Sequence, residues 1–251
     1  MLLKMQSLRH QVANNKKSIL SNEKYLSHTY SDSVAPPSQY PDLLAKWLLE
    51  NVFHRPGKIA DFGCGRGDFL RAFKSLQFEP HGLDISPNIK NLSEFNVKQV
   101  DFINDDVPYT DEKYDFIFSK SVIEHLREPT PYFSAIYEGL KEDGKAVVMV
   151  PSWAHTYWGP FYIDYTHVTP FTAKSLKDAL EMAGFENVSV RYFYQLPVVW
   201  KYPWLKPLIQ IFSKLPLPYA PYNDVPWQTS NKFNKLIRFS KEVMLIAIVE
   251  K

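Results

Sequence analysis

The chain has 251 residues, 45% of them hydrophobic and 22% charged, which is typical of a folded globular protein and excludes an intrinsically disordered one. Its formal net charge of +2 gives no reason to expect strong binding to polyanions. The single cysteine, Cys64, excludes an intrachain disulfide and favours a reducing compartment. The sequence contains no run of about 18 apolar residues and no signal-peptide core, so we expect a cytoplasmic protein without a membrane-spanning helix.

Residues 1–37 are predicted to form an N-terminal appendage. The first 22 residues contain four basic side chains and no acidic one, and Pro36-Pro37 excludes a helix at that point. Pro41 is expected to open a helix, because Leu44 and Leu48 follow it at helical spacing.

After this helix, strand and helix patterns alternate, which predicts an α/β fold with a parallel sheet covered on both faces. Short apolar runs predict strands at 58–62, 80–84, 98–102, 114–119, 144–150, 187–193 and 243–249. Helices are expected near 68–77, 87–94, 130–141 and 172–183, the last with Thr172 as its N-cap and Gly184 at its C-terminal end. The core domain is therefore predicted to comprise residues 38–193 and 241–251.

Residues 194–240 form an insertion that is much longer than a turn between the last two strands requires. No acidic residue occurs from Asn187 to Asn223, whereas lysines and aromatic residues alternate with prolines, and residues 207–215 predict a short amphipathic helix. Three interpretations remain open for this insertion: a lid over the site, a homodimer surface, or peripheral membrane contact through residues 194–223.

A glycine-rich turn follows the first predicted strand and is the most informative motif in the chain. Residues 58–67 read Lys-Ile-Ala-Asp-Phe-Gly-Cys-Gly-Arg-Gly, and Asp84 follows Asp61 by 23 positions, at the end of the next strand. Glycines at such a turn let the backbone approach a ligand, and a carboxylate on the next strand can bind a ribose diol. Asp68 occupies the position of the third glycine of a dinucleotide-binding loop, and no Gly-Lys-Ser/Thr follows, so NAD, FAD and phosphate-loop sites are excluded.

The motif Asp-x-Gly-x-Gly-x-Gly resembles the loop of the class I S-adenosylmethionine-dependent methyltransferases. The segments 81–87, 100–102, 114–119, 122–126 and 143–151 support the resemblance by their order and spacing. It implies a doubly wound, Rossmann-like sheet of seven strands, mostly parallel, whose last strand inserts antiparallel between the fifth and sixth. It also implies S-adenosylmethionine as the cofactor.

The resemblance assigns the cofactor to the carboxyl edge of the sheet, where ligands of doubly wound folds bind. The turn residues Gly63, Cys64, Gly65 and Gly67 are expected to face the methionine end, with Asp61 orienting the turn or the methionine ammonium. Asp84, beside Ile85, would bind the ribose. Asp101 would accept from the adenine amino group, Phe102 would lie near the adenine ring, and Ser119 would flank the methionyl part.

Two histidines follow strands at this edge and are candidates for a catalytic base. His125 comes after the fourth strand and His167 after the fifth, and Asp164 could orient His167. An imidazole can accept the proton that an acceptor hydroxyl loses during methyl transfer. Alternatively, His125 only supports its loop, and Asp164 and His167 only shape the chain before the next helix.

No metal is expected as a cofactor, although one alternative stays open. Some methyltransferases that this chain resembles carry Glu-x-x-Glu-His as metal ligands. Ser121 stands at the first glutamate position here, which leaves Glu124, His125 and His167 as a three-ligand set.

We therefore expect a methyltransferase that uses S-adenosylmethionine to methylate an oxygen on a small-molecule, glycan or lipid-linked acceptor, held between residues 152–171 and the insertion. Nucleic acid is not the expected partner, because the chain lacks a concentrated basic stripe. Two alternatives remain: an N-methyltransferase that acts on an amine or on RNA, and a subunit that binds the cofactor without turnover.

Overall fold

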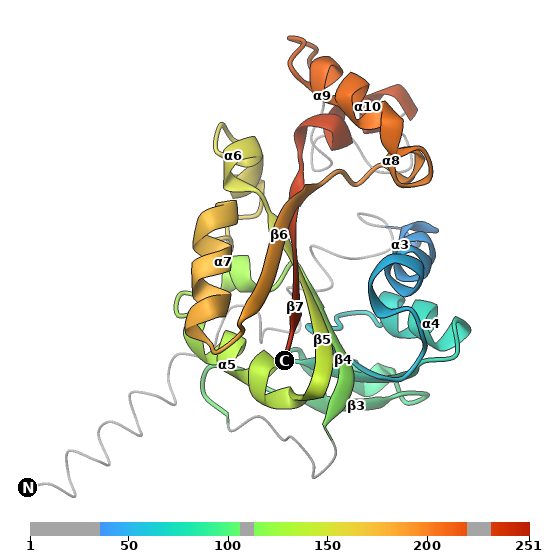
Figure 1. Cartoon of the computed structure of the whole chain (residues 1–251), viewed down its shortest axis with the longest axis vertical. Helices are drawn as coiled ribbons and strands as arrows, with labels where there is room; N and C mark the ends of the chain where they lie inside the picture. Colours follow the sequence, from blue (N-terminus) through green and yellow to red (C-terminus); the bar gives the residue numbers. More distant parts are fainter. Residues whose placement is uncertain (1–35, 106–112, 220–231) are drawn as a thin grey trace, which may run out of the picture.

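The structure is a computed structural model and describes residues 36–105, 113–219 and 232–251, so nearly all of the predicted N-terminal appendage lies outside the described residues. The described part is built around one sheet with the strand order β3-β2-β1-β4-β5-β7-β6 (Figure 1). The strands are β1 (Lys58–Phe62), β2 (Glu79–Asp84), β3 (Asn96–Gln99), β4 (Tyr114–Lys120), β5 (Leu140–Pro151), β6 (Asn187–Phe193) and β7 (Met244–Glu250).

The pairing of the strands confirms the predicted doubly wound sheet. The pairs formed by β1 with β2 and β4, by β2 with β3 and by β4 with β5 are parallel, whereas β7 runs antiparallel between β5 and β6. Met244, at the start of β7, pairs with Pro151 at the end of β5 and with Phe193 at the end of β6. The carboxyl ends of all the other strands therefore lie at the edge where β7 begins, which is the upper end in Figure 1.

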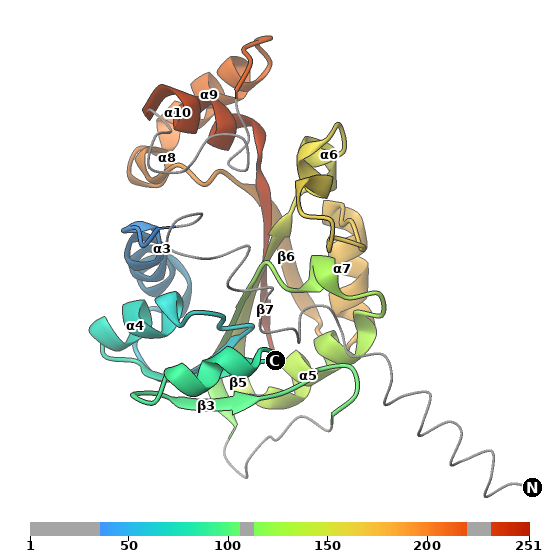
Figure 2. The ribbon, with the colours of Figure 1, turned by 180° about the vertical axis from the view of Figure 1, so that it is seen from behind.

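Helices cover both faces of the sheet. Figures 1 and 2 place α3 (Tyr40–Leu48) and α4 (Asp68–Ser75) on one side, and α5 (Thr130–Gly139) and α7 (Ala173–Met182) on the other. Each face has its own apolar core, with Leu44 and Phe73 in one and Tyr132 and Leu176 in the other. The near-continuous apolar runs of β4 and β5 follow from this burial on both faces.

The ends of α7 follow the sequence prediction. The Thr172 side chain accepts from the Ser175 N–H at 3.1 Å, and the Ser175 hydroxyl accepts from the Thr172 N–H at 2.9 Å, which is a reciprocal capping box. Gly184 follows the helix with φ +107°, in the left-handed region that glycine adopts at little cost.

Two predicted elements differ from the structure. The third strand covers Asn96–Gln99 rather than 98–102, because the Asp101 carboxylate accepts from the Ile103 N–H at 3.0 Å and turns the chain out of the sheet. The segment predicted as a helix over 87–94 is a short 3₁₀ helix, η3 (Pro87–Asn91), which the Ser86 hydroxyl caps by accepting from the Asn88 N–H at 3.2 Å.

The remaining elements gather mainly at the carboxyl edge. The predicted amphipathic helix is present as α9 (Lys206–Ser213), together with α8 (Pro197–Lys201), η6 (Pro203–Leu205) and α10 (Lys232–Lys241). We call these four elements, with residues 214–219, the helical cap. The elements α6 (Trp153–Thr156) and η5 (Pro160–Ile163) follow β5, η4 (Ile123–His125) follows β4, and the π-helix η2 (Leu49–Phe53) extends α3.

The position of the cap follows from the order of the elements along the chain. It lies between the end of β6 and the start of β7, so it stands on the carboxyl edge, at the same end of the molecule as α6 (Figures 1 and 2). Across the ranges that the structure describes, no helix combines the length and the apolar character that a membrane span requires.

Candidate functional site

The glycine-rich turn is locked against two neighbouring segments. The N–H groups of Gly63 and Cys64 donate to the Leu83 carbonyl at 2.6 and 3.2 Å, which ties the turn to β2. Gly63 has φ +86°, and a Cβ at this position would lie 2.2 Å from Cγ2 of Val122. Gly63 therefore lets the turn pack directly on the segment that follows β4.

Gly65 differs from Gly63, because its surroundings are open. Its φ is +50°, and a Cβ at this position would have no heavy atom within 4 Å. Its N–H donates to Oδ2 of Asp84 at 2.8 Å. Gly67 comes next, as the N-cap of α4. Of the described turn, Gly65 is thus the point where a ligand can approach the backbone, beside the Asp84 carboxylate.

Two buried carboxylates lie beneath this open point. Asp61 is only 3% exposed, and its pKa is raised well above the usual range by burial first and by Asp84 and Asp68 second. Burial also raises the pKa of Asp84, although N–H groups of Ser86 and Gly65 offset part of the effect. Buried carboxylates that repel one another favour a cationic ligand, which would lower both pKa values.

Cys64 and Ile85 border the same turn. Burial raises the pKa of the Cys64 thiol, and the nearby Asp61 adds to this effect, so the thiol is neutral and is no nucleophile. The Ile85 carbonyl accepts from Nε2 of Gln99 at 2.9 Å.

Three predicted cofactor residues form contacts within the protein. Both Asp101 carboxylate oxygens accept within their own turn, from the Ile103 N–H at 3.0 Å and from Nδ2 of Asn104 at 2.8 Å. The Phe102 ring is 7% exposed and packs in the core against Tyr132, with ring centroids 4.8 Å apart.

Ser119 also lies inside the protein. It is 1% exposed, and its hydroxyl is 2.7 Å from that of Tyr132, which donates to the Phe62 carbonyl at 3.1 Å. Tyr132 thus fixes the ends of β1 and β4, a role that sequence reasoning missed because tyrosine at a helix position signals only core packing.

The second group of predicted residues comes together after β4 and β5. The Glu124 carbonyl accepts from the N–H groups of Val168 and Thr169 at 2.8 and 3.0 Å, which docks the segment after η5 onto η4. This docking brings the rings of His125 and His167 to a centroid separation of 4.7 Å at 65°. The segment after β4 also packs on the glycine turn, because Val122 contacts Gly63.

The hydrogen bonds of these rings define their tautomers. The Thr166 hydroxyl donates its one hydrogen to Oδ1 of Asp164 at 2.6 Å, so Nδ1 of His125, 2.8 Å from that hydroxyl, must be the donor to it. Nδ1 of His167 lies 2.5 Å from the Phe161 carbonyl, which can only accept. The lone pair of His167 consequently lies on Nε2.

Both imidazoles are neutral at physiological pH. Burial first, and the neighbouring His167 second, lower the pKa of His125 to about 4. Burial also lowers the pKa of His167, and the Asp164 carboxylate offsets part of this effect. The Nε2 lone pair of His167 is therefore available for a proton or a cation.

Glu124 completes this cluster. Its side chain is 0% exposed, and neither carboxylate oxygen forms a hydrogen bond with a described residue, although Ser121 and the residue's own N–H group lie near it. Burial raises its pKa to about 8. Ligand atoms of Glu124, His125 and His167 all lie within 4.8 Å of one another, so the three side chains could hold a metal ion.

The contacts of Asp164 differ from the one that the sequence suggested. Its carboxylate reaches His125 through Thr166, and it lies close enough to His167 to raise the pKa of that ring. Thr166 and the Phe161 carbonyl, which orient the two rings, were not identified from the sequence. Only the spacing Asp-x-Thr pointed to Thr166, since an Asp side chain commonly accepts from the residue two positions later.

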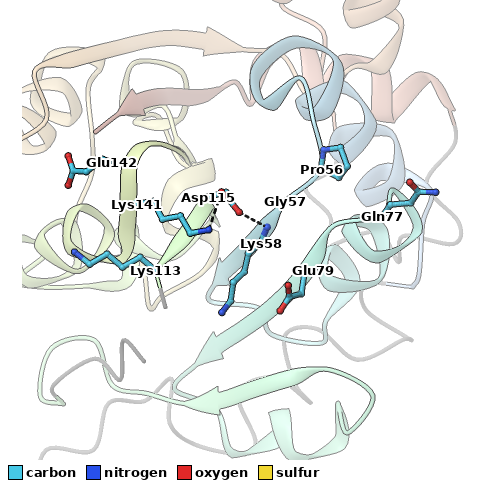
Figure 3. Close-up of a pocket in the computed structure, with 9 residues that line it drawn as sticks. All are labelled: Pro56, Gly57, Lys58, Gln77, Glu79, Lys113, Asp115, Lys141 and Glu142. Atoms are coloured by element: carbon cyan, nitrogen blue, oxygen red, sulfur yellow. Dashed lines mark hydrogen bonds and ion pairs between the residues drawn. The ribbon is translucent and has the colours of Figure 1, made fainter. Parts of the chain in front are cut away.

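A hollow at the opposite edge of the sheet has a different character (Figure 3). It is lined by Lys58, Glu79 and Asp115, which stand at or beside the first residues of β1, β2 and β4, and Lys141 forms an ion pair with Asp115 at 3.2 Å. This amino edge lacks the glycine turn and both histidines, so we exclude the hollow as the site of the chemistry.

Comparisons with known proteins agree with the geometry of the carboxyl edge. The chain is 28% identical over 147 residues to phosphoethanolamine N-methyltransferase 2 of Caenorhabditis elegans, which covers 53% of this chain and 34% of that protein. It is 27% identical over 115 residues to a tRNA U34 carboxymethyltransferase of Sulfurimonas denitrificans, covering 40% and 37% of the two chains. It is 27% identical over 97 residues to a ubiquinone biosynthesis O-methyltransferase of Cereibacter sphaeroides, covering 36% and 39%.

The chain thus spans only about a third of the length of these relatives, and their names cover different acceptors. A crystal structure of a SAM-dependent methyltransferase from Archaeoglobus fulgidus shares the fold, with a TM-score of 0.55, 22% identity, and coverage of 84% of this chain and 94% of that one. The sequence model of the family described as "Methyltransferase domain" matches residues 37–190. The chain therefore belongs to this family and contains a methyltransferase domain.

Proposed function

We propose that this protein uses S-adenosylmethionine to transfer a methyl group to an oxygen of a small-molecule, glycan or lipid-linked acceptor. The observation that supports the proposal is the pair of neutral imidazoles, His125 and His167, whose ring centroids lie 4.7 Å apart after β4 and β5, with the lone pair of His167 on Nε2. An amine can enter the reaction with its own lone pair, whereas a hydroxyl must lose a proton as its bond to the methyl group forms. A proton acceptor at this position therefore favours oxygen.

We assign the cofactor to the turn at Gly65, with Asp84 binding the ribose and Asp61 near the positively charged methionyl end. Displacement at the sulfonium methyl forms the oxygen–carbon bond, breaks the carbon–sulfur bond and releases S-adenosylhomocysteine. The hydroxyl proton passes to Nε2 of a histidine. A lowered pKa does not prevent this step, because the oxygen becomes strongly acidic once it carries the incoming methyl group.

His167 is the better candidate for this base, and Asp164 is a positioning residue. The Nδ1 atom of His167 lies against the Phe161 carbonyl, which leaves the lone pair of its ring on Nε2. Asp164 reaches His125 through Thr166 and also moderates the pKa of His167. Its negative charge would stabilise the imidazolium that forms on proton transfer.

The acceptor would lie between the two segments that rise above the carboxyl edge. Trp158, which follows α6, and Tyr219 of the cap contact each other, with ring centroids 5.9 Å apart at 88°. The two segments thus meet above the sheet. Their aromatic side chains suit stacking on sugars or other rings.

A divalent cation bound by Glu124, His125 and His167 is the second candidate for activating the acceptor. The buried carboxylate of Glu124 and one ring nitrogen from each histidine fit such an ion, while Ser121 stands at the first glutamate position of the Glu-x-x-Glu-His pattern. When bound, the ion would polarise the acceptor hydroxyl. In this case the histidines would serve as ligands and not as bases.

Release of S-adenosylhomocysteine, measured with a panel of phenols, sugars, polyprenyl-linked sugars and amines, tests the proposal. We expect turnover with a hydroxyl acceptor, and we expect His167→Ala to lower kcat by about 10²-fold, the lower limit for a lost general base. His155→Ala is the matched control, because His155 is a half-buried histidine of α6 that bonds to Ser152 at 3.0 Å outside the cluster. Undiminished turnover in His167→Ala would remove it as the base, and a requirement for added Mg²⁺, Mn²⁺ or Zn²⁺ after chelation would favour the cation.

The similarity to a phosphoethanolamine N-methyltransferase supports an amine acceptor as the second candidate function. In that case an amine in the panel would turn over, and both histidine variants would retain kcat. The similarity to a tRNA U34 carboxymethyltransferase is a reason to include RNA in the panel. Turnover on RNA would indicate a nucleic-acid acceptor.

A further inference from the structure

The helical cap exposes apolar side chains that a folded protein usually buries. Trp204, Leu208 and Ile211 are 69%, 56% and 64% exposed, and Leu215 and Phe233 are 44% and 58% exposed. Although α9 is rich in apolar residues, none of its eight residues is buried. Contiguous exposed apolar surface of this kind marks an interaction site.

The charge of the chain is divided between the cap region and the rest. Residues 194–243 contain seven basic and two acidic residues, a net charge of +5, whereas the whole chain carries +2, so the remainder carries −3. Of the two acids, Glu242 forms an ion pair with Arg238 at 2.8 Å. The net positive charge of the cap region therefore comes from its shortage of acidic residues, and it accompanies the exposed apolar side chains.

The facing segment after β5 adds exposed aromatic side chains at the same end. Tyr157, Trp158, Tyr162 and Tyr165 are between 54% and 73% exposed. Both views place α6 at the end of the molecule that carries the cap (Figures 1 and 2). Tyrosine and tryptophan favour the boundary between water and the apolar part of a bilayer.

We propose that the cap binds the surface of an anionic lipid bilayer, with Trp204, Leu208 and Ile211 inserted at the interface and the lysines near the lipid headgroups. A second copy of the chain is a poor occupant, because two surfaces that each carry +5 repel each other. A polyanion would pair with the lysines but would leave the apolar side chains in water. A bilayer with anionic lipids satisfies both features.

This binding would turn the carboxyl edge, and with it the mouth of the methyl-transfer site, toward the bilayer. A lipid-linked acceptor would then reach the site without leaving the membrane, an extension that rests on the proposed function. Binding to the bilayer does not rest on the proposed function, because it can be measured without any acceptor. If this binding failed, the proposed methyl transfer would be unaffected.

Co-sedimentation of the full-length protein with vesicles tests the proposal. We expect binding to vesicles of phosphatidylcholine mixed with phosphatidylglycerol, weaker binding to phosphatidylcholine alone, and release at high salt. The variant Ile211→Ser should lower the partition coefficient about tenfold, because an apolar side chain is no longer buried. Lys214→Glu should lower it at least fivefold, since one basic residue near an anionic surface is worth about that factor.

Two variants on other surfaces serve as matched controls. Met182→Ser replaces an apolar residue that is 85% exposed at the end of α7, and Lys113→Glu reverses a lysine at the hollow of the amino edge. Both should bind vesicles like the wild type, and circular dichroism should show all four variants folded. The proposal fails if the wild type does not co-sediment with anionic vesicles, or if the controls lose as much binding as the cap variants. It also fails if sedimentation shows a dimer that Ile211→Ser dissociates.

Discussion

The difference between Gly63 and Gly65 leads to a prediction that separates stability from cofactor binding. Both residues have positive φ, so an alanine at either position costs about 1–2 kcal/mol in backbone energy. At Gly63 the new Cβ would also lie 2.2 Å from Val122, and relieving such a contact costs about 1–3 kcal/mol more. Gly63→Ala should therefore lose roughly 2–5 kcal/mol of unfolding free energy.

Gly65→Ala should lose only the backbone cost, because its Cβ would meet nothing within 4 Å. The new methyl group would instead occupy the space that we assign to the cofactor. We expect the unfolding free energy of Gly65→Ala to be about 1–2 kcal/mol lower than that of the wild type. We also expect this variant to bind S-adenosylhomocysteine at least tenfold more weakly.

Urea unfolding and isothermal titration calorimetry measure the two effects. Gly63→Ala should show the larger loss of stability, and its kcat should also fall, since Val122 precedes the Glu124–His125 turn. Equal losses of stability in the two variants would refute the packing argument. Wild-type affinity for S-adenosylhomocysteine in Gly65→Ala would refute the placement of the cofactor.

Three further predictions concern the cluster around His125. Because burial lowers the pKa of both histidines, the two rings stay neutral at pH values below the ordinary histidine pKa of about 6.5. The kcat on a hydroxyl acceptor should therefore stay near its maximum down to about pH 6. A fall in kcat centred at about pH 6.5 would contradict this prediction. Thr166→Val and Thr156→Val each remove a buried hydroxyl and should lower stability by about 1–3 kcal/mol. Only Thr166→Val should also lower kcat, about tenfold (roughly 1.4 kcal/mol), because it separates Asp164 from His125 and leaves that ring without its fixed orientation. The pKa of Glu124 is raised from 4.5 to about 8, so the folded state binds a proton that the unfolded state releases between these pH values. With a chelator present, the wild type should therefore lose up to roughly 4 kcal/mol of unfolding free energy as the pH rises from about 4.5 to 8. Glu124→Gln should not show this loss. Urea unfolding at both pH values checks the last point, and recovery of the wild type alone on adding Zn²⁺ would indicate a bound cation.

The sequence was sufficient for the sheet and the glycine turn because both depend on local signals. Apolar runs of strand length between capped helices predicted six of the strands closely, and the spacing from Asp61 to Asp84 follows from a strand, a helix and a second strand. The third strand was placed two to three residues too late, because the side chain of Asp101 ends it and apolar periodicity does not register that contact.

The helical cap shows where local signals were insufficient. Its amphipathic helix α9 was predicted, but no pattern indicated that none of its residues would be buried. Burial depends on which other segments pack nearby, and these are distant in sequence.

The sequence by itself determined the fold class, the cofactor turn and the presence of two histidines at strand ends, since each depends on neighbouring residues. Only the tertiary structure decided that the Glu124 carboxylate is buried, that Thr166 joins Asp164 to His125 and that the lone pair of His167 lies on Nε2. The physical reason is that these features arise where the segment after η5 docks on η4, about 40 residues away along the chain. Burial and hydrogen bonding across such a contact set the pKa values, and the order of residues within either segment does not encode them.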